Sequence, residues 1–309
     1  WQARCVRMSP STGGLVSAIH PNQLDPKRPM KDFRNKVAAI TGAASGMGRT
    51  LAVQLAQRGC HLALSDVNEA GLAETAQLVR QHGVKVTTAK LNVADREAMF
   101  AWADQVVRDH GKVNLIFNNA GVSLTVNLDV VKQSDFDWIM GINFWGVVYG
   151  TQAFLPHLKK SGDGHVINTS SLLGLMAVPT QGTYNATKFA VRGYTEALRM
   201  ELELAGEPVS ATCVHPGGIA TNIAKAGKFD DSMERVAGVS IDKQRKMADK
   251  MISTTTAESA ALQILKAVEN NERRVLVGPD ARILDKLVRL MGSAYQVLIV
   301  RRLRRMRTQ

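Results

Sequence analysis

From residue 36 onward, short apolar runs alternate with longer stretches in which apolar residues recur every three or four positions. Seven of these runs have the length and composition of buried strands, and they lie at 36–41, 61–66, 85–92, 113–119, 164–171, 209–216 and 274–278. Stretches such as residues 47–59 and 96–111 have the period of helices that bury one face. Strands that alternate with helices form βαβ units with right-handed crossovers. The pattern therefore predicts one α/β domain over residues 31–279, a doubly wound, seven-stranded parallel sheet with helices on both faces.

The two ends of the chain lie outside this pattern. Residues 1–30 have no clear period and contain the turn-rich segments SPSTGG and HPNQLDPKRP, so we expect a disordered or extended arm. The arm lacks the long apolar run of a secretory signal, but Arg4 and Arg7 precede any acidic residue and leave a mitochondrial leader open. Met30 is a candidate for the natural start. Residues 280–309 are expected to form a basic amphipathic helical extension.

The net charge of +12 is concentrated at the two ends of the chain. Residues 1–36 hold seven basic and two acidic residues, and residues 273–309 hold ten basic and two acidic residues. The middle of the chain holds 22 basic and 23 acidic residues. The body therefore has no excess of positive charge with which to bind a polyanion, and we expect no nucleic-acid partner.

Cysteine and histidine usage indicates neither a metal site nor a disulfide framework. The three cysteines, Cys5, Cys60 and Cys213, are widely spaced, and the seven histidines include no H-E-x-x-H motif. We therefore expect no metal and a reducing, cytoplasmic location.

A glycine-rich turn follows the first predicted strand. Gly42, Gly46 and Gly48 lie in TGAASGMG, directly before a predicted helix. Such glycines let the backbone approach a pyrophosphate, which the helix N-terminus attracts. The second predicted strand ends in Asp66, whose carboxylate suits the ribose hydroxyls of an adenosine and repels the 2′-phosphate of NADP. NAD is therefore favoured over NADP, with Arg49 the residue most able to reverse this. The alternatives are structural: a tight turn, a helix cap and a solvated arginine.

Tyr184 and Lys188 lie four positions apart in QGTYNATKFAV, at the start of a predicted helix. Residues at this spacing share a helix face, and a nearby ammonium lowers the pKa of a phenol towards neutral pH. Ser171 ends a predicted strand, at the edge where open parallel sheets bind their ligands. We expect the Ser171 and Tyr184 hydroxyls to lie beside one carbonyl oxygen. A surface tyrosine and a turn-capping serine are the structural alternatives.

These motifs together resemble the short-chain dehydrogenase/reductase family, in its compact single-domain Rossmann form, from about residue 33 to 279. TGAASGMG is similar to the family's cofactor turn, and NNAG, residues 118–121, to its marker after the fourth strand. Asn143 in MGINFWGV stands where the family has its catalytic asparagine, and HPGGIATNI resembles the segment over the nicotinamide. The resemblance implies an oxidoreductase that transfers a hydride between NAD(H) and a secondary alcohol or ketone.

The resemblance also implies a role for each residue. Tyr184 is the expected general acid in reduction and general base in oxidation, and Lys188 lowers its pKa and holds the nicotinamide ribose. Ser171 hydrogen-bonds the substrate oxygen, and Asn143 holds a water of a proton relay. The expected cofactor-binding residues are Gly42, Ser45, Gly46, Met47, Gly48, Asp66, Asn92, Val93, Asn119, Ala120, Gly121, Tyr184, Lys188, Pro216, Gly217, Ile219 and Thr221. Asn92 replaces the family's usual aspartate, so we expect weaker but intact adenine recognition.

Residues 217–255 correspond to the family's substrate lid. The methionines Met233, Met247 and Met251 favour an adaptable cover over an apolar substrate, although ordinary helix packing explains them equally well. A homodimer or homotetramer is usual in the family. A catalytically weak nucleotide-binding regulatory protein of the same fold, attached to a membrane surface, is the alternative function.

The C-terminal extension combines apolar and basic residues. A helical stripe is formed by Leu284, Leu287, Val288, Met291, Tyr295 and Leu298, and it is followed by Arg301, Arg302, Arg304, Arg305 and Arg307. No apolar run approaches the ~20 residues that span a bilayer. One interpretation is peripheral contact with an anionic membrane. The others are packing on the enzyme's own body or on a partner subunit, with a solvated arginine tail.

Overall fold

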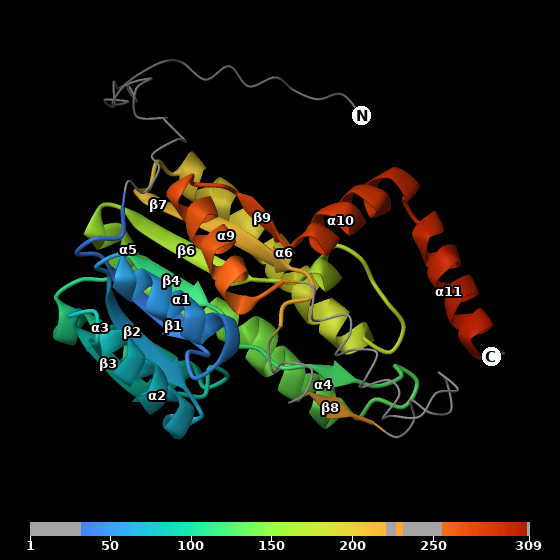
Figure 1. Cartoon of the computed structure of the whole chain (residues 1–309), viewed down its shortest axis with the longest axis horizontal. Coiled ribbons are helices and arrows are strands. Elements are labelled where there is room, and N and C mark those ends of the chain that lie inside the picture. Colours follow the sequence, from blue (N-terminus) through green and yellow to red (C-terminus); the bar gives the residue numbers. More distant parts are fainter. Residues whose placement is uncertain (1–31, 221–226, 231–254, 308–309) are drawn as a thin grey trace, which may run out of the picture.

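The computed structural model of the chain describes residues 32–220, 227–230 and 255–307 (Figure 1). The expected N-terminal arm, Thr221 and the three methionines of the expected lid lie outside the described residues.

Seven parallel strands form the central sheet, in the order β3-β2-β1-β4-β6-β7-β9. Their bounds are β1 Val37–Thr41, β2 His61–Asp66, β3 Val86–Lys90, β4 Leu115–Asn118, β6 Gly164–Thr169, β7 Val209–Pro216 and β9 Arg274–Val277. Each strand lies within one of the seven predicted apolar runs, so the predicted fold class is confirmed. The strand order reverses between β1 and β4, and this reversal opens a crevice at the carboxyl ends of the two strands, where doubly wound sheets bind ligands.

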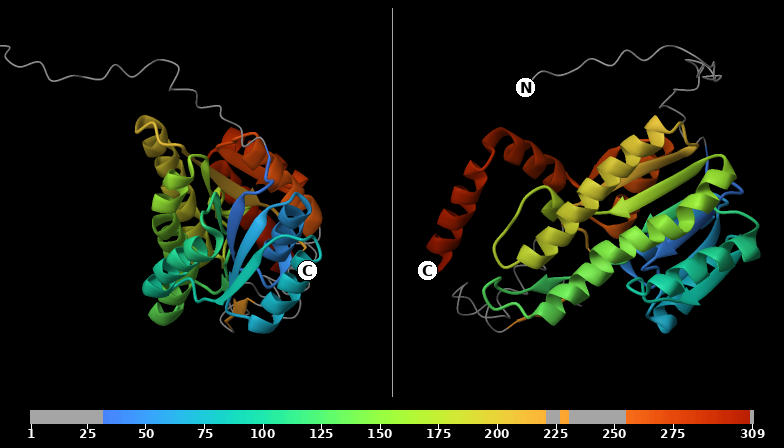
Figure 2. Two further views of the ribbon diagram at one scale, coloured as in Figure 1. Left: turned by 90° about the vertical axis from the view of Figure 1, so that its left-hand side faces the viewer. Right: turned by 180° about the vertical axis from the view of Figure 1, so that it is seen from behind.

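Helices cover both faces of the sheet. Their bounds are α1 Gly46–Gln57, α2 Glu69–Arg80, α3 Arg96–His110, α4 Gln133–Met140, α5 Gly146–Ser161, α6 Gly182–Leu204, α9 Ala257–Glu269, α10 Pro279–Met291 and α11 Ala294–Arg307. Figure 2 shows the sheet between two helical layers, with α3, α5 and α6 on the face opposite to α1 and α9.

The alternation of side chains along each strand divides the core into two halves. In β1, Ala38 and Ile40 belong to the cluster under α1, α2 and α9, whereas Val37 and Ala39 belong to the cluster under α3, α5 and α6. All residues of β1 are buried, as expected of a strand covered on both faces. This double burial explains why the predicted runs are continuous and apolar rather than alternating.

Four short elements were absent from the sequence-based prediction. β5 (Leu124–Thr125) pairs in parallel with β8 (Lys228–Phe229), which holds part of the expected lid beside the carboxyl end of β4. A π-helix, η2 (Gly141–Trp145), joins α4 to α5, and a 3₁₀ helix, η3 (Leu172–Gly174), follows β6.

The C-terminal extension consists of two helices rather than the one continuous helix implied by the predicted stripe. α10 ends at Met291, and Gly292 has a positive φ of 54° that ends the helical path. α10 and α11 project from the body at an angle to each other (Figure 1). No helix of the described residues is both long and apolar enough to cross a membrane.

Candidate active site

The crevice between β1 and β4 is closed by a tight backbone turn. Gly42 has a φ of 67°, which favours glycine, and a Cβ built on it would lie 2.8 Å from the Ala120 Cα. The Asn119 side chain donates to the carbonyl oxygens of Thr41 (3.1 Å) and Gly42 (3.3 Å). The hydroxyl of Thr41 accepts from the backbone N–H groups of Asn119 and Ala120. The NNAG segment thus braces the glycine turn.

The N-terminus of α1 points into this crevice with its positive end unneutralised. The first turn of α1 has no acidic residue, and the N-cap residue Ser45 makes no side-chain capping hydrogen bond. A Cβ on Gly48 would lie 2.1 Å from the Gly42 carbonyl oxygen, so only glycine lets the helix start this close to the turn. Backbone N–H groups and an exposed serine hydroxyl at a helix N-terminus suit the pyrophosphate of a dinucleotide.

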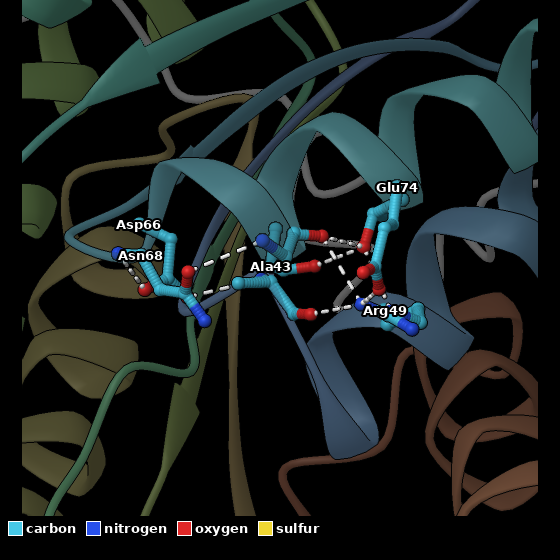
Figure 3. Close-up of polar contacts among 8 residues, drawn as sticks. Ala43, Arg49, Asp66, Asn68 and Glu74 are labelled. Carbon is cyan, nitrogen blue, oxygen red and sulfur yellow. Dashed lines mark hydrogen bonds and ion pairs between the residues drawn. The ribbon is translucent and has the colours of Figure 1, made fainter.

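Asp66 lies at the tip of β2, beside the glycine turn (Figure 3). Its two carboxylate oxygens accept from the backbone N–H groups of Ala44 (2.9 Å) and Asn68 (2.9 Å). These bonds fix the orientation of a partly exposed carboxylate that can accept further hydrogen bonds from ribose hydroxyls. Asn68, not Asp66, caps α2 by accepting from Gly71 N, so the helix-cap alternative for Asp66 is wrong.

Arg49 binds the protein itself and is not the solvated side chain considered as its structural alternative. Its guanidinium donates to the carbonyl oxygens of Ala44 (2.6 Å) and Gly71 (3.1 Å), to the Thr75 hydroxyl and to the Glu74 carboxylate. Figure 3 shows that these bonds tie α1 to α2 behind the turn. The arginine is therefore already engaged away from the tip of Asp66.

The remaining expected cofactor residues surround the same crevice. Asn92 is exposed, and its side-chain oxygen accepts from Ala94 N (3.1 Å), which leaves one lone pair for an adenine amino group. Val93 is buried, and Met47 packs on the core beside α1. After Pro216 at the end of β7, Gly218 N donates to the Asp280 carboxylate (2.6 Å), and Ile219 is buried. Thr221 lies outside the described residues.

Tyr184 and Lys188 lie on the first turns of α6, as predicted. Lys188 is buried, donates to the Thr169 carbonyl oxygen (3.0 Å), and places its Nζ 5.6 Å from the centre of the Tyr184 ring. The ring packs against Leu124, Val126 and Ile139. The surface alternative for this pair is therefore wrong, because the ammonium lies inside the protein.

Ser171 follows β6 and caps η3, with its hydroxyl accepting from Leu173 N (3.1 Å). Its side chain is near enough to Tyr184 to lower the pKa of the phenol, so the two hydroxyls lie in the same place. Close packing holds this arrangement: a Cβ on Gly174 would lie 2.3 Å from Ser170 Oγ and 2.7 Å from the Lys188 carbonyl oxygen. The loop after β6 therefore sits directly on the first turns of α6.

Asn143 lies at the centre of the π-helix and is fully buried. Its side chain pairs with the backbone of Val122, accepting from the N–H (2.8 Å) and donating to the carbonyl oxygen (2.9 Å). A Cβ on Gly121 would lie 3.3 Å from Asn143 Oδ1 and 3.6 Å from Lys188 Nζ. Asn143 and Lys188 thus meet over Gly121, which has no side chain to separate them.

Burial controls the acidity of the site. It raises the pKa of the Tyr184 phenol, and the hydrogen bond to Ser171 acts in the opposite direction. It lowers the pKa of Lys188 to about 8. The sequence analysis expected a lowered pKa for Tyr184, but in the protein by itself desolvation dominates and the pKa of the phenol is raised. The pair consists of a protonated phenol and a lysine that titrates near neutral pH.

Three supporting residues were missed by the sequence analysis. Asn185 donates to the carbonyl oxygens of Leu173 and Met176 and accepts from Val178 N, so it fixes the loop after Ser171. His215 Nδ1 lies 3.0 Å from the Ser171 carbonyl oxygen, and burial lowers its pKa to about 4. Asp280 binds Gly218. Asn185 and His215 stand inside the motifs YNATK and HPGG, but their types alone did not indicate these contacts.

Within the described residues, no group of three or more His, Cys, Asp or Glu side chains is placed to hold a metal ion. Cys60 and Cys213 are buried free thiols whose pKa burial raises to about 12, so they are not nucleophiles.

Comparison with known proteins identifies the family. The family model described as short chain dehydrogenase matches residues 36–231, and the chain belongs to this family of oxidoreductases. SadH of Mycobacterium tuberculosis, a protein named as an oxidoreductase, is 47% identical over 270 residues, which cover 87% of this chain and 96% of SadH. YxnA of Bacillus subtilis, also named as an oxidoreductase, is 32% identical over 279 residues, covering 88% of this chain and 75% of YxnA.

Solved structures agree with this assignment. A short chain dehydrogenase/reductase from Burkholderia phymatum in complex with NAD superposes with a TM-score of 0.77 at 31% identity, covering 86% of this chain and 97% of that one. A levodione reductase superposes with a TM-score of 0.70 at 26% identity, and the match covers 81% of this chain and 99% of the levodione reductase. The glycine turn, the unneutralised helix N-terminus and Asp66 fit the nicotinamide dinucleotide that the family implies.

Proposed function

We propose that the protein is an NAD(H)-dependent dehydrogenase/reductase that interconverts a secondary alcohol and a ketone. The observation that carries this proposal is the meeting of Ser171, Tyr184 and Lys188 beyond the carboxyl end of β6, next to the dinucleotide crevice. The bound nicotinamide would supply or accept the hydride, and the chain's own residues would bind the oxygen and move its proton.

Tyr184 is the proton donor to the carbonyl oxygen in reduction. Its raised pKa keeps the phenol protonated at neutral pH, and the apolar walls around its ring exclude water. The Ser171 hydroxyl, which lies beside Tyr184, turns its one proton to the same oxygen when the substrate is bound and stabilises the charge that develops on it. Two donors at one point favour a C=O or CH–OH group as the reacting centre.

Lys188 is the next member of a proton relay. Its ammonium contacts the Thr169 carbonyl oxygen and lies beside Asn143 and Gly121, in reach of the nicotinamide ribose in the family's arrangement. A pKa of about 8 suits a group that takes up a proton from solvent and returns it to the tyrosine. Asn143 uses its side chain on Val122 and so aligns the relay by holding the backbone around Gly121.

The preference for NAD rests on Asp66 and Arg49. A carboxylate at the tip of β2 accepts from ribose hydroxyls and repels a 2′-phosphate. The one nearby arginine expected to offset this repulsion is held by Ala44, Gly71, Thr75 and Glu74. That the Burkholderia phymatum protein was solved with NAD supports the same preference.

The test is turnover of a panel of ketones and secondary alcohols with NADH/NAD and NADPH/NADP. We expect higher kcat/KM with NAD(H), and loss of turnover by about 10²–10⁴ in Tyr184→Phe with NADH binding retained, since only the proton donor is removed. Asp66→Ser should lower kcat/KM for NAD about tenfold and narrow the gap to NADP. Unchanged turnover in Tyr184→Phe would refute the mechanism.

Glu74→Gln is the matched control for the cofactor argument. It weakens the hold on Arg49 without touching Asp66 or the turn. We expect it to leave the NAD to NADP ratio unchanged. If NADP turnover rises instead, Arg49 reads the phosphate and the preference is wrongly assigned.

The substrate side favours a molecule with an apolar body. Leu124 and Val126 line the tyrosine ring, and Leu175 and Met176 lie on the loop after Ser171; all four are buried apolar side chains. The levodione reductase, named for the reduction of a dione, supports a ketone as the reacting group.

We also propose a homo-oligomer formed through α5 and α6. Their outer faces expose large apolar side chains, namely Phe189, Met200 and Leu204 on α6 and Trp145 directly before α5. Two copies can bury these faces as an antiparallel helical layer. Light scattering of the native protein and of Phe189→Glu tests this, and a variant of unchanged mass would exclude the interface.

A further inference from the structure

α10 has apolar residues on both sides: Leu284, Val288 and Met291 are partly buried, whereas a second set faces solvent. Ala281 and Asp285, one turn apart, are buried against the body, whereas Ile283, Leu287 and Leu290 are 63%, 40% and 89% exposed. Two residues along a helix correspond to a rotation of about 200°, so the stripe of Ile283 and Leu287 lies opposite to the face that carries Ala281 and Asp285. Ile283, Leu287 and Leu290 are therefore an apolar surface that the body does not cover.

α11 continues this exposed surface. Val297, Leu298, Val300 and Leu303 are 50%, 49%, 41% and 42% exposed. They are interleaved with and followed by the exposed arginines Arg301, Arg302, Arg304 and Arg305. We call the exposed apolar residues of α10 and α11, together with these four arginines, the C-terminal patch. Figures 1 and 2 show that both helices stand out from the body, so the patch is open to a partner.

Contacts with the body anchor α10 and α11, so the C-terminal patch has a fixed position. Asp280 accepts from Gly218 N (2.6 Å), and Asp285 binds Arg274 (3.3 Å) and Arg289 (3.0 Å). Tyr295 of α11 is buried and accepts from Ala177 N (3.0 Å), on the loop that follows Ser171. A solvated tail would need no such anchors. The C-terminal patch is therefore a candidate binding surface.

Charge decides between the possible occupants. The two acidic residues of α10, Asp280 and Asp285, both contact the body. The exposed end of α11 carries four arginines within residues 301–305. A second copy seated on the patch would bring two arginine clusters together, and like charges at close range repel. An anionic lipid surface takes up both features, since acyl chains accept the apolar residues and headgroups the arginines.

We propose that the C-terminal patch docks the enzyme on the surface of a membrane rich in anionic lipid. α10 and α11 lie in the interface with the apolar residues facing the acyl boundary, and the arginines pair with lipid phosphates. The anchors at Gly218 and Ala177 place the membrane on the substrate side of the enzyme. The helices do not cross the bilayer.

The test is co-sedimentation of the full chain with vesicles of phosphatidylglycerol and phosphatidylcholine, against vesicles of phosphatidylcholine alone. We expect binding to the anionic vesicles at about 0.05 M NaCl that weakens strongly at about 0.5 M, because salt screens the arginines. Replacement of Arg301, Arg302, Arg304 and Arg305 by serine should lower the partition coefficient about 100-fold or more. Ile283→Ser with Leu290→Ser should lower it about tenfold or more.

Two matched variants separate the patch from general effects. Replacement of Arg80, Lys112, Lys132 and Lys160 by serine removes the same charge from exposed positions scattered over the body. Leu78→Ser with Leu262→Ser removes two exposed leucines elsewhere. Both should bind vesicles as the native protein does.

Three results would overturn the proposal: no binding of the native protein to anionic vesicles at low salt, equal loss in the patch and scattered variants, or a fall in molecular mass by light scattering in Ile283→Ser with Leu290→Ser. The last result would assign the patch to a second copy. Turnover of the same variants in solution tells loss of docking apart from loss of the proposed reaction.

Discussion

At the residue scale, Lys188 is the group whose ionisation we expect to set the upper pH limit of reduction. Burial lowers its pKa to about 8. Below this pH the ammonium is present and can return a proton to Tyr184, and above it the relay is empty. We therefore predict that kcat/KM for ketone reduction falls with a slope of one proton as the pH rises through about 8, measured with NADH under single-substrate conditions.

Lys188→Arg and Lys188→Met test this assignment together. A guanidinium does not deprotonate in this range, so any activity that the arginine variant retains should lack the fall near pH 8. The methionine variant should lose activity by about 10²–10⁴ below pH 8, where the native ammonium is present. A native profile that stays flat to pH 10 would assign the relay to another group.

The sequence was informative about residues whose chemistry is local to a motif. Tyr184 and Lys188 were placed on one helix face by their spacing, and Gly42 and Gly48 on one turn. The direction of the tyrosine pKa was not predictable, because it depends on apolar groups brought from β5 and α4, far away in the chain. Asp280 was missed for the same reason, since its partner Gly218 is 62 residues away.

At the element scale, the packing of the loop after β6 on α6 makes one glycine indispensable and another replaceable. Gly174→Ala places a Cβ 2.3 Å from Ser170 Oγ and 2.7 Å from the Lys188 carbonyl oxygen. We predict a loss of about 1–3 kcal/mol in stability and a fall in kcat, because the loop carrying Ser171 must move away from α6. Thermal unfolding and turnover measure the two effects.

Gly193→Ala on the same helix is the control. A Cβ at Gly193 meets nothing within 4 Å, and the residue lies in the middle of α6. Alanine in a helix interior is favoured over glycine by roughly 0.5–1 kcal/mol, so the melting temperature should rise. A fall in both variants would indicate that α6 tolerates no change, rather than a specific clash at Gly174.

Elements were predictable where the hydrophobic period was long. All seven strands of the central sheet lie within predicted runs, because burial on both faces makes each run continuous. The pair β5 and β8 was missed, since two residues each carry no period. The π-helix at Asn143 was missed because GINFW has no sequence signal for this type of helix. Two hydrogen bonds between the Asn143 side chain and the Val122 backbone hold this segment in place.

At the scale of the whole molecule, fold class and charge distribution were readable from the chain, but the arrangement of the C-terminal arm was not. The stripe from Leu284 to Leu298 suggested one helix, whereas the break at Gly292 makes two. Sequence period identifies an apolar face but not whether that face meets the body. Only the structure shows that Leu284, Val288 and Met291 are partly buried, whereas Ile283, Leu287 and Leu290 face outward.

Two buried histidines should control the stability of the whole fold in acid. His165 is buried in β6 beside Thr212, and burial lowers its pKa to about 3; the pKa of His215 in β7 is lowered to about 4. In the unfolded chain both titrate near 6.5. Below that pH each of these two imidazoles binds a proton in the unfolded state but not in the folded state, so the free energy of unfolding decreases as the pH falls, by about 1.4 kcal/mol per pH unit for each of the two. Burial also lowers the pKa of the partly buried His110, which acts in the same direction. Above pH 6.5 neither contributes a slope.

We therefore predict a melting temperature that is level above about pH 7 and declines steeply from about pH 6 to 4, before most carboxylates titrate. His165→Asn removes one of the titrating groups, so its decline should be clearly less steep than that of the native protein, even if its stability at pH 7 is lower. His157→Asn, which changes a partly exposed histidine whose ring contacts Asp104 at the surface, should keep the full slope. Equal slopes in all three proteins would mean that the buried imidazoles do not set the acid limit. Because His215 Nδ1 lies 3.0 Å from the Ser171 carbonyl oxygen, protonation of His215 would act directly on the loop that carries Ser171.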